Sequence, residues 1–119
     1  MIKVERVDFV SVPVRDLDRA RAFYGEMLGL PESPHTPNEF ETSNVTIGLW
    51  HPESDGEEFQ PNTAGVALRV PDVHAAIQEL GAKGAEIIGV QDSGVCHMGF
   101  VKDTEGNVLI LHKRYTPHG

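Results

Sequence analysis

Two segments of the chain, Val10–Val14 and Val66–Val70, alternate apolar residues with polar or small ones. An alternation with a period of two predicts strands that bury one face. An aspartate follows each segment at the same spacing, Asp16 in the first and Asp72 in the second. Aspartate commonly caps the N-terminus of a helix. The chain therefore repeats a strand, a cap and the start of a helix.

The repeat continues beyond the caps. Apolar positions at helical spacing predict helices over Leu17–Leu28, ended by Gly29, and over Val73–Leu80, ended by Gly81 or Gly84. Strand-like segments separated by turn residues follow each helix: Glu39–Glu41 and Val45–Trp50 after the first, and Ala85–Val90, Val95–Val101 and Val108–His112 after the second. We predict one α+β domain over residues 1–119, made of two tandem βαβββ modules at about residues 5–52 and 64–114, with a polar linker at about residues 53–63.

Length and composition argue against several classes of protein, namely nucleic-acid-binding, membrane-spanning and secreted proteins. A length of 119 residues fits one domain, and the net charge of −8 argues against a nucleic-acid partner. The longest strongly apolar run, Val108–Leu111, is far too short to span a membrane. The single cysteine, Cys96, excludes an internal disulfide, and the first residues lack an apolar secretion signal. We therefore expect a cytoplasmic protein.

Several motifs in register resemble the vicinal-oxygen-chelate superfamily, which includes glyoxalases, bleomycin resistance proteins and dioxygenases. Its opening module is resembled by Phe9–Leu17, Ala22–Tyr24 and Leu28–Leu30, and its second opening by Gly65–Val73. Asp103–Val108 resembles its closing Asp-Pro-x-Gly-Asn turn, with Thr104 in place of proline. The resemblance covers about residues 7–114. It implies that the sheets curl into one open, roughly eight-stranded cup with the helices outside and a ligand inside. It also implies a homodimer, since members commonly associate.

Strand parity predicts which side chains face this cup. The continuous apolar rows pack under the helices: Val10, Val12 and Val14; Val45, Ile47 and Leu49; Val66, Leu68 and Val70; Leu109 and Leu111. The opposite parity lines the cup: Phe9, Ser11 and Pro13; Thr46, Gly48 and Trp50; Gly65, Ala67 and Arg69; Val108, Ile110 and His112. If a four-residue loop spans Asp103–Gly106, His97 lies opposite His112 and shares the cup side with Gly99 and Val101, while Met98 and Phe100 face the helix.

The predicted ligand-binding residues are Phe9, Ser11, Thr46, Trp50, Arg69, His97, Ile110 and His112. This mixture of apolar, aromatic and cationic side chains suits a small organic molecule with an aromatic or anionic part. Taken alone, Trp50 fits core packing and ligand stacking equally well, and Arg69 alone fits a surface salt bridge.

The resemblance also implies where a metal would bind, because metal-dependent members place His, Gln or Glu ligands near the start of each first strand and the end of each last strand. The matching positions here are Phe9, Gly48, Gly65 and Ile110, and none offers a lone pair. We therefore expect no metal at the family position and no cofactor.

Three functions remain open. The first is a metal-free protein that binds or sequesters a small organic ligand in the cup. The alternative is a lyase, isomerase or dioxygenase-like enzyme that uses His97 and His112 as acid-base groups or as an unusual metal site. A third is a degenerate module that pairs with another protein.

Overall fold

The computed structural model describes residues 1–117, and the chain divides into two compact units, Met1–Gln60 (module 1) and Pro61–Gly119 (module 2). Module 1 contains β1 (Phe9–Pro13), α1 (Leu17–Ala22), the π-helical turn η1 (Phe23–Met27), β2 (Glu39–Glu41), β3 (Thr46–Trp50) and the 3-10 helix η2 (Pro52–Asp55). Module 2 contains β4 (Val66–Arg69), α2 (Val73–Ala82), β5 (Glu86–Asp92), β6 (Cys96–Lys102) and β7 (Val108–Arg114). The fold is α+β, with two tandem modules, as predicted.

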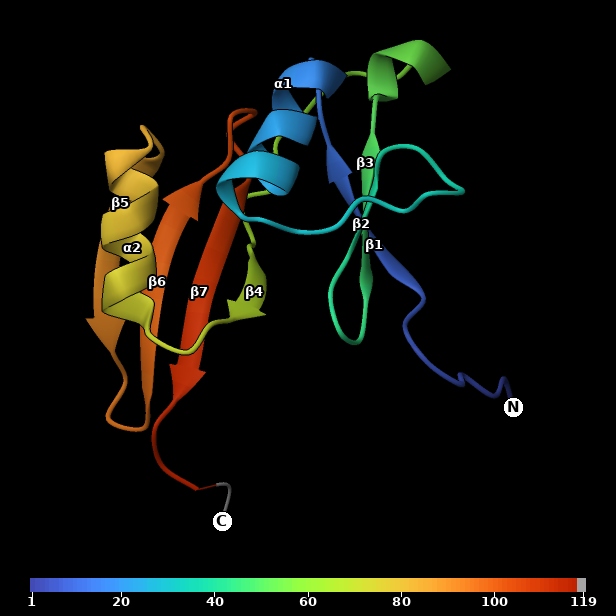
Figure 1. The fold of residues 1–119 in the computed structure, drawn as a ribbon. Coiled ribbons are helices and arrows are strands. Elements are labelled where there is room, and N and C mark those ends of the chain that lie inside the picture. Colours follow the sequence, from blue (N-terminus) through green and yellow to red (C-terminus); the bar gives the residue numbers. More distant parts are fainter. Residues whose placement is uncertain (118–119) are drawn as a thin grey trace. The chain divides into compact units, whose positions relative to one another are not determined.

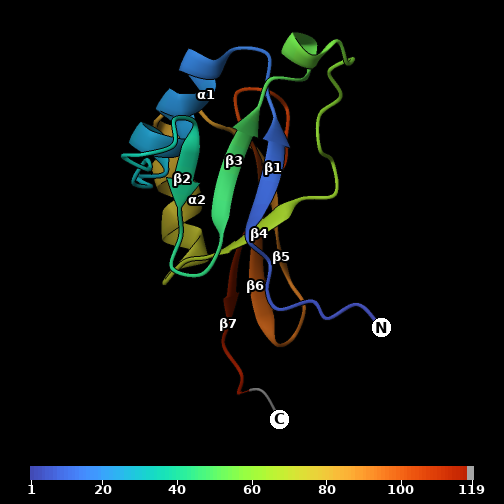
Figure 2. The ribbon, with the colours of Figure 1, turned by 90° about the vertical axis from the view of Figure 1, so that its right-hand side faces the viewer.

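Both modules share one strand topology. The orders are β1-β3-β2 and β4-β7-β6-β5, and in each module the first strand runs parallel to the last. Figure 2 shows β3 between β1 and β2. A bridge between Glu32 and Phe40 occupies the place in module 1 that β5 has in module 2. The part of the chain at residues 1–117 thus has seven strands, one in each segment that the sequence predicts, where the family resemblance implies roughly eight. Pro31, Pro34 and Pro37 remove strand N–H donors from the segment before β2.

The first helix departs from the continuous helix predicted over Leu17–Leu28. Asp16 caps α1 by accepting a hydrogen bond from the Arg19 N–H at 3.0 Å, but the chain changes to a π-helical turn at Phe23. The wider turn lets two consecutive aromatic residues, Phe23 and Tyr24, both be buried. Tyr24 packs near Phe40 of β2, and a Cβ on Gly25 would lie 3.2 Å from the Phe40 ring. This glycine therefore allows η1 its close approach to β2.

In module 2, α2 packs across one face of β5, β6 and β7 (Figure 1). Asp72 caps it by accepting from the Ala75 N–H at 3.0 Å, and Gly84 with φ 94° follows its end. The buried side chains between helix and sheet are Val73, Leu80, Val101, Leu109 and Leu111. No helix within residues 1–117 has the length and apolarity needed to cross a membrane.

Candidate functional site

We call the face of the module 1 sheet opposite the buried side chains of Val12 and Ile47 its open face, and it carries the residues that strand parity predicts for it. The parallel register pairs Phe9 with Thr46, Ser11 with Gly48 and Pro13 with Trp50, so these six residues share one face. The other face carries the apolar positions Val10, Val12, Ile47 and Leu49, of which Val12 and Ile47 are almost wholly buried. The expectation that this face and that of module 2 line one cup stays a prediction.

Trp50 ends β3 with its ring on this open face and 37% of its surface exposed. Its indole N–H donates to Asp55 Oδ2 of η2 at 2.8 Å. The polar group of the side chain is therefore satisfied within the module, while part of the ring surface stays accessible. Such a ring is oriented for stacking without needing a ligand to accept from its nitrogen.

The open face of the module 2 sheet, opposite α2, forms two rows across the strands. Register pairs place Arg69, His112, Met98 and Gln91 in one row, and Ala67, Ile110, Phe100 and Gly89 in the next. The second row is apolar, with small residues at both ends and the half-buried Ile110 and Phe100 between them. The first row places Arg69 beside His112 at the edge of this apolar strip.

One prediction about this face is wrong. His97 pairs with Lys113, and His112 pairs with Met98, so His97 and His112 are not opposite one another. The loop between β6 and β7 contains five residues, Asp103–Asn107, since Lys102 pairs with Val108. One extra loop residue moves every side chain of β6 to the other face. His97, Gly99 and Val101 consequently lie on the helix face, and Met98 and Phe100 on the open face.

His97 belongs to a polar cluster on the helix side of module 2. Its ring lies 5.2 Å from that of His74 on α2 and 4.7 Å from that of Tyr115, and its Nε2 is 3.5 Å from Asp92 Oδ2. The Tyr115 hydroxyl donates to Asp92 Oδ1 at 2.8 Å. The Gly94 N–H and this hydroxyl lower the pKa of Asp92, and the same bond to Asp92 raises the pKa of Tyr115. His97 therefore has partners unrelated to the open face.

The Asp92–Tyr115 bond predicts a measurable titration change. In Asp92→Asn the pKa of Tyr115 should fall toward the ordinary value of about 10, because the charged acceptor is lost. Because the pKa of Tyr115 is raised in the fold, its protonated phenol stabilises the fold below about pH 10, and this contribution is lost as the pH rises and the phenol ionises. Because the pKa of Asp92 is lowered, its carboxylate stabilises the fold above about pH 4, and this contribution is lost as the pH falls. NMR titration of the Tyr115 ring measures the shift. An unchanged Tyr115 pKa in the variant would contradict this assignment.

The positions that would hold the family metal do not fit one. In module 1, Phe9 and Gly48 provide no donor, and a Cβ on Gly48 would lie 3.9 Å from the Phe9 ring. In module 2, a Cβ on Gly65 would lie 2.9 Å from Ile110 Cδ1, so the Ile110 side chain occupies the space that a ligating side chain at position 65 would need. Each module thus replaces one expected ligand with an apolar side chain and the other with glycine.

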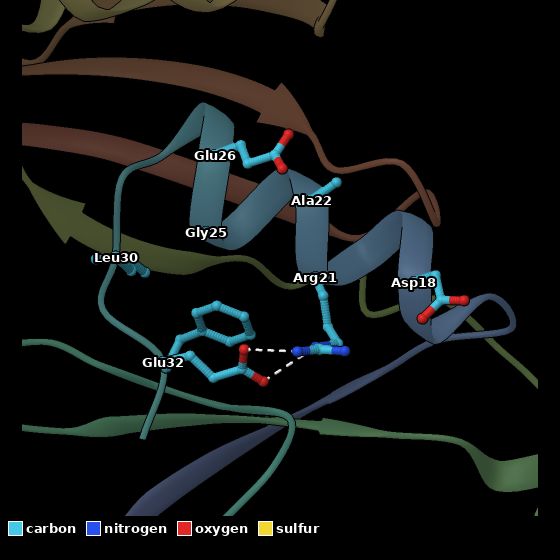
Figure 3. Close-up of a pocket in the computed structure, with 8 residues that line it drawn as sticks. Asp18, Arg21, Ala22, Gly25, Glu26, Leu30 and Glu32 are labelled. Atoms are coloured by element: carbon cyan, nitrogen blue, oxygen red, sulfur yellow. Dashed lines mark hydrogen bonds and ion pairs between the residues drawn. The ribbon is translucent and has the colours of Figure 1, made fainter. Parts of the chain in front are cut away.

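A groove of about 410 Å³, which no sequence pattern indicates, lies on the surface of module 1 beside α1 and η1. Its lining includes Asp18, Gly25, Glu26 and Phe40, with Arg21 and Glu32 joined by two hydrogen bonds of 2.8 and 3.0 Å (Figure 3). The bond to Arg21 lowers the pKa of Glu32, and the bond to Glu32 raises the pKa of Arg21. Because Arg21 and Glu32 pair with one another, the groove offers a ligand fewer unpaired charged groups than the open faces do. No sequence pattern brings residue 21 to residue 32.

The tandem βαβββ topology and the motifs define a class of small-molecule-binding and enzymatic proteins. The sequence matches the Glyoxalase/Bleomycin resistance protein/Dioxygenase superfamily over residues 6–111, and the chain belongs to this superfamily.

Relatives differ in what their names describe. A "Probable lactoylglutathione lyase" of Vibrio parahaemolyticus is 28% identical, spanning 89% of this chain and 88% of that protein. The structure of TnmS3, an antibiotic binding protein from Streptomyces sp. CB03234, is similar with a TM-score of 0.78 and 22% identity, over 96% of this chain and 99% of that one. A lactoylglutathione lyase from Agrobacterium tumefaciens has a TM-score of 0.73 and 15% identity, over 92% and 93% of the chains. The structural similarities establish the fold alone.

Proposed function

We propose that this protein binds a small organic molecule on the open faces of its sheets without a metal ion at the family position. The observation that carries the proposal is the apolar replacement of all four expected ligands, with Ile110 packed over Gly65. A divalent ion needs several donors at about 2 Å, and none of these side chains supplies one. The same replacement adds apolar surface suited to an organic group.

The open faces support this proposal by their composition. Module 1 contributes Phe9, Ser11, Thr46 and Trp50, and module 2 contributes Arg69, Ile110 and His112. To these the structure adds Met98 and Phe100, which the corrected register places on the open face of module 2. His97 is no longer a candidate for this surface. Antibiotic binding by TnmS3, a protein of the same fold, is consistent with such a role.

A ligand screen tests the proposal. Purified protein, dialysed against a chelator, is heated with a panel of neutral, anionic and cationic aromatic compounds. A compound that binds the folded state raises the melting temperature by an amount that grows with the logarithm of its concentration relative to its Kd. We expect at least one class of compound to do so, and chemical shifts in labelled protein should map its contacts to the open faces. A panel without any binder would contradict the proposal.

The Trp50 ring provides a mutational test. In Trp50→Ala, binding of a ligand found by the screen should weaken by about 1–3 kcal/mol, the usual range for a large apolar contact. Trp50→Phe, which keeps a flat ring, should lose less. Tyr115→Ala is the control, because Tyr115 is an exposed aromatic residue that contacts His97 on the helix side of module 2. Equal affinity of wild type and Trp50→Ala would remove Trp50 from the site.

An enzymatic role is the second candidate, and the 28% identity to a "Probable lactoylglutathione lyase" favours it. The His97–His112 pair can no longer supply the chemistry, since the two residues lie on opposite faces of the sheet. His112 alone would have to act as the acid-base group on module 2. A lactoylglutathione lyase assay with and without added nickel or zinc decides this point. Turnover that is lost in His112→Gln would favour the enzyme.

We also propose a cytoplasmic location and a homodimer. The free, buried Cys96 suits a reducing compartment. The edge strand β5 exposes Ile88 and Val90, at 52% and 43%, and an apolar edge of this kind favours pairing with a second copy. Sedimentation should give twice the chain mass of 13.0 kDa, and Ile88→Lys should shift it toward the monomer. A 13.0 kDa species at high protein concentration would contradict the dimer.

A further inference from the structure

We infer that the open face of module 2 selects an anionic ligand with a flat apolar body, such as an aromatic carboxylate, and that Arg69 is the residue that holds the anion. This inference rests on the proposed function and specifies the chemistry of its ligand. Arg69 ends β4 and is exposed, and its register partner on β7 is His112. Adjacent strands lie about 4.8 Å apart, so the two side chains are immediate neighbours.

The Arg69 guanidinium has no hydrogen bond or ion pair with any residue of the described chain, and neither does the His112 ring. Several other cations are paired with acidic residues: Arg21 with Glu32, Lys83 with Glu79, and Lys102 with Glu86 on this same face. In a chain with a net charge of −8, an arginine left beside an imidazole is unusual, because an acidic partner would be easy to supply. The pair offers fork-shaped donors that match a carboxylate.

The surface beside this pair fits the rest of such a ligand. Met98 follows His112 in the same row, and the neighbouring row runs Ala67, Ile110, Phe100 and Gly89. Small residues at both ends leave the half-buried Ile110 and Phe100 as a strip that a ring can cover. The next position, Lys102, is already neutralised by Glu86 at 3.6 Å. The positive charge of Arg69, which has no acidic partner among residues 1–117, thus lies at one edge of an apolar strip.

The test uses two matched pairs of probes: 2-naphthoate with 2-naphthamide, and benzoate with benzamide. Titrations of isotope-labelled full-length protein are followed by NMR. We expect each carboxylate to bind about tenfold more tightly than its amide, with chemical-shift changes in β4 and β7. A charge-assisted hydrogen bond is about twice as strong as a neutral one, and this difference in free energy corresponds to about a tenfold difference in affinity. Arg69→Gln should abolish the difference, and Arg69→Lys should retain part of it.

Lys113→Gln is the matched control, because Lys113 follows His112 on β7 and lies on the helix face. It should preserve the preference for carboxylates. Equal affinity for carboxylate and amide in wild type, or a preference that survives in Arg69→Gln, would overturn the inference. Binding of neutral or cationic compounds with no binding of carboxylates would overturn the inference and leave the proposed function standing. No binding by any class of compound would overturn both.

Discussion

Replacing Asn107 by alanine should lower the free energy of unfolding by about 2–4 kcal/mol, although the residue lies in a loop. Asn107 is 1% exposed; its amide donates to Asp103 Oδ2 at 2.9 Å, and its Oδ1 accepts from the Asn62 N–H at 2.8 Å. Truncation leaves the buried Asp103 carboxylate and the half-buried Asn62 N–H without these bonds, and a buried group left unsatisfied costs about 1–3 kcal/mol. The side chain thereby fixes the β6–β7 loop to the segment that precedes β4.

Urea denaturation of wild type and variant measures the loss. Asn44→Ala is the control, since Asn44 is an exposed residue in the turn between β2 and β3 and accepts a bond of 3.2 Å from the Thr42 hydroxyl. Its substitution should change stability by no more than about 0.5 kcal/mol. Similar small losses in both variants would show that Asn107 does not organise the loop.

The second large effect is expected from Gly99→Val, which should destabilise the fold by about 3 kcal/mol. A Cβ at position 99 would lie 2.7 Å from Cγ1 and Cδ1 of Ile77 and 3.1 Å from Cγ1 of Val73, both on α2. Two further methyl groups cannot enter this contact unless the helix moves away from β6. Overpacking of a core commonly costs about 1–3 kcal/mol, and this contact is at the upper end.

Gly89→Val is the matched control, because Gly89 lies on β5 and a Cβ there would meet no atom within 4 Å. It should leave the unfolding free energy nearly unchanged. Combining Gly99→Val with Ile77→Ala should restore part of the loss, since the colliding side chain is removed. Additive losses in the double variant would contradict the steric explanation.

The sequence predicts α2, the start of α1, most strand positions and the faces of β1, β3, β4 and β7, because each depends on local periodicity. Val10, Val12 and Val14 alternate without interruption, as do Val66, Leu68 and Val70, and a two-residue period assigns faces directly. The face of β6 depends instead on the length of a loop. Asp103 Oδ1 accepts from the N–H groups of both Glu105 and Asn107, which draws Asn107 into the loop and shifts the register by one.

Other features depend on contacts that no local pattern contains. The π-helical turn at Phe23–Met27 follows from the packing of Tyr24 against Phe40, residues far apart in sequence. The partners of His97 come from α2, from the end of β5 and from Tyr115 beyond β7. The alternation that assigns Arg69 to the open face cannot say whether an acidic residue pairs with it. Side-chain partners on neighbouring strands can be predicted only when the register is known, and the register depends on the lengths of the loops.

Metal-free ligand binding is tested most directly by one measurement, the melting temperature of chelator-dialysed protein with a screened ligand, with and without stoichiometric nickel or zinc. Phe9, Gly48, Gly65 and Ile110 offer no metal donor, so the ligand should raise the melting temperature equally in both conditions. A ligand-dependent rise that occurs with restored metal and disappears after chelation would contradict the account.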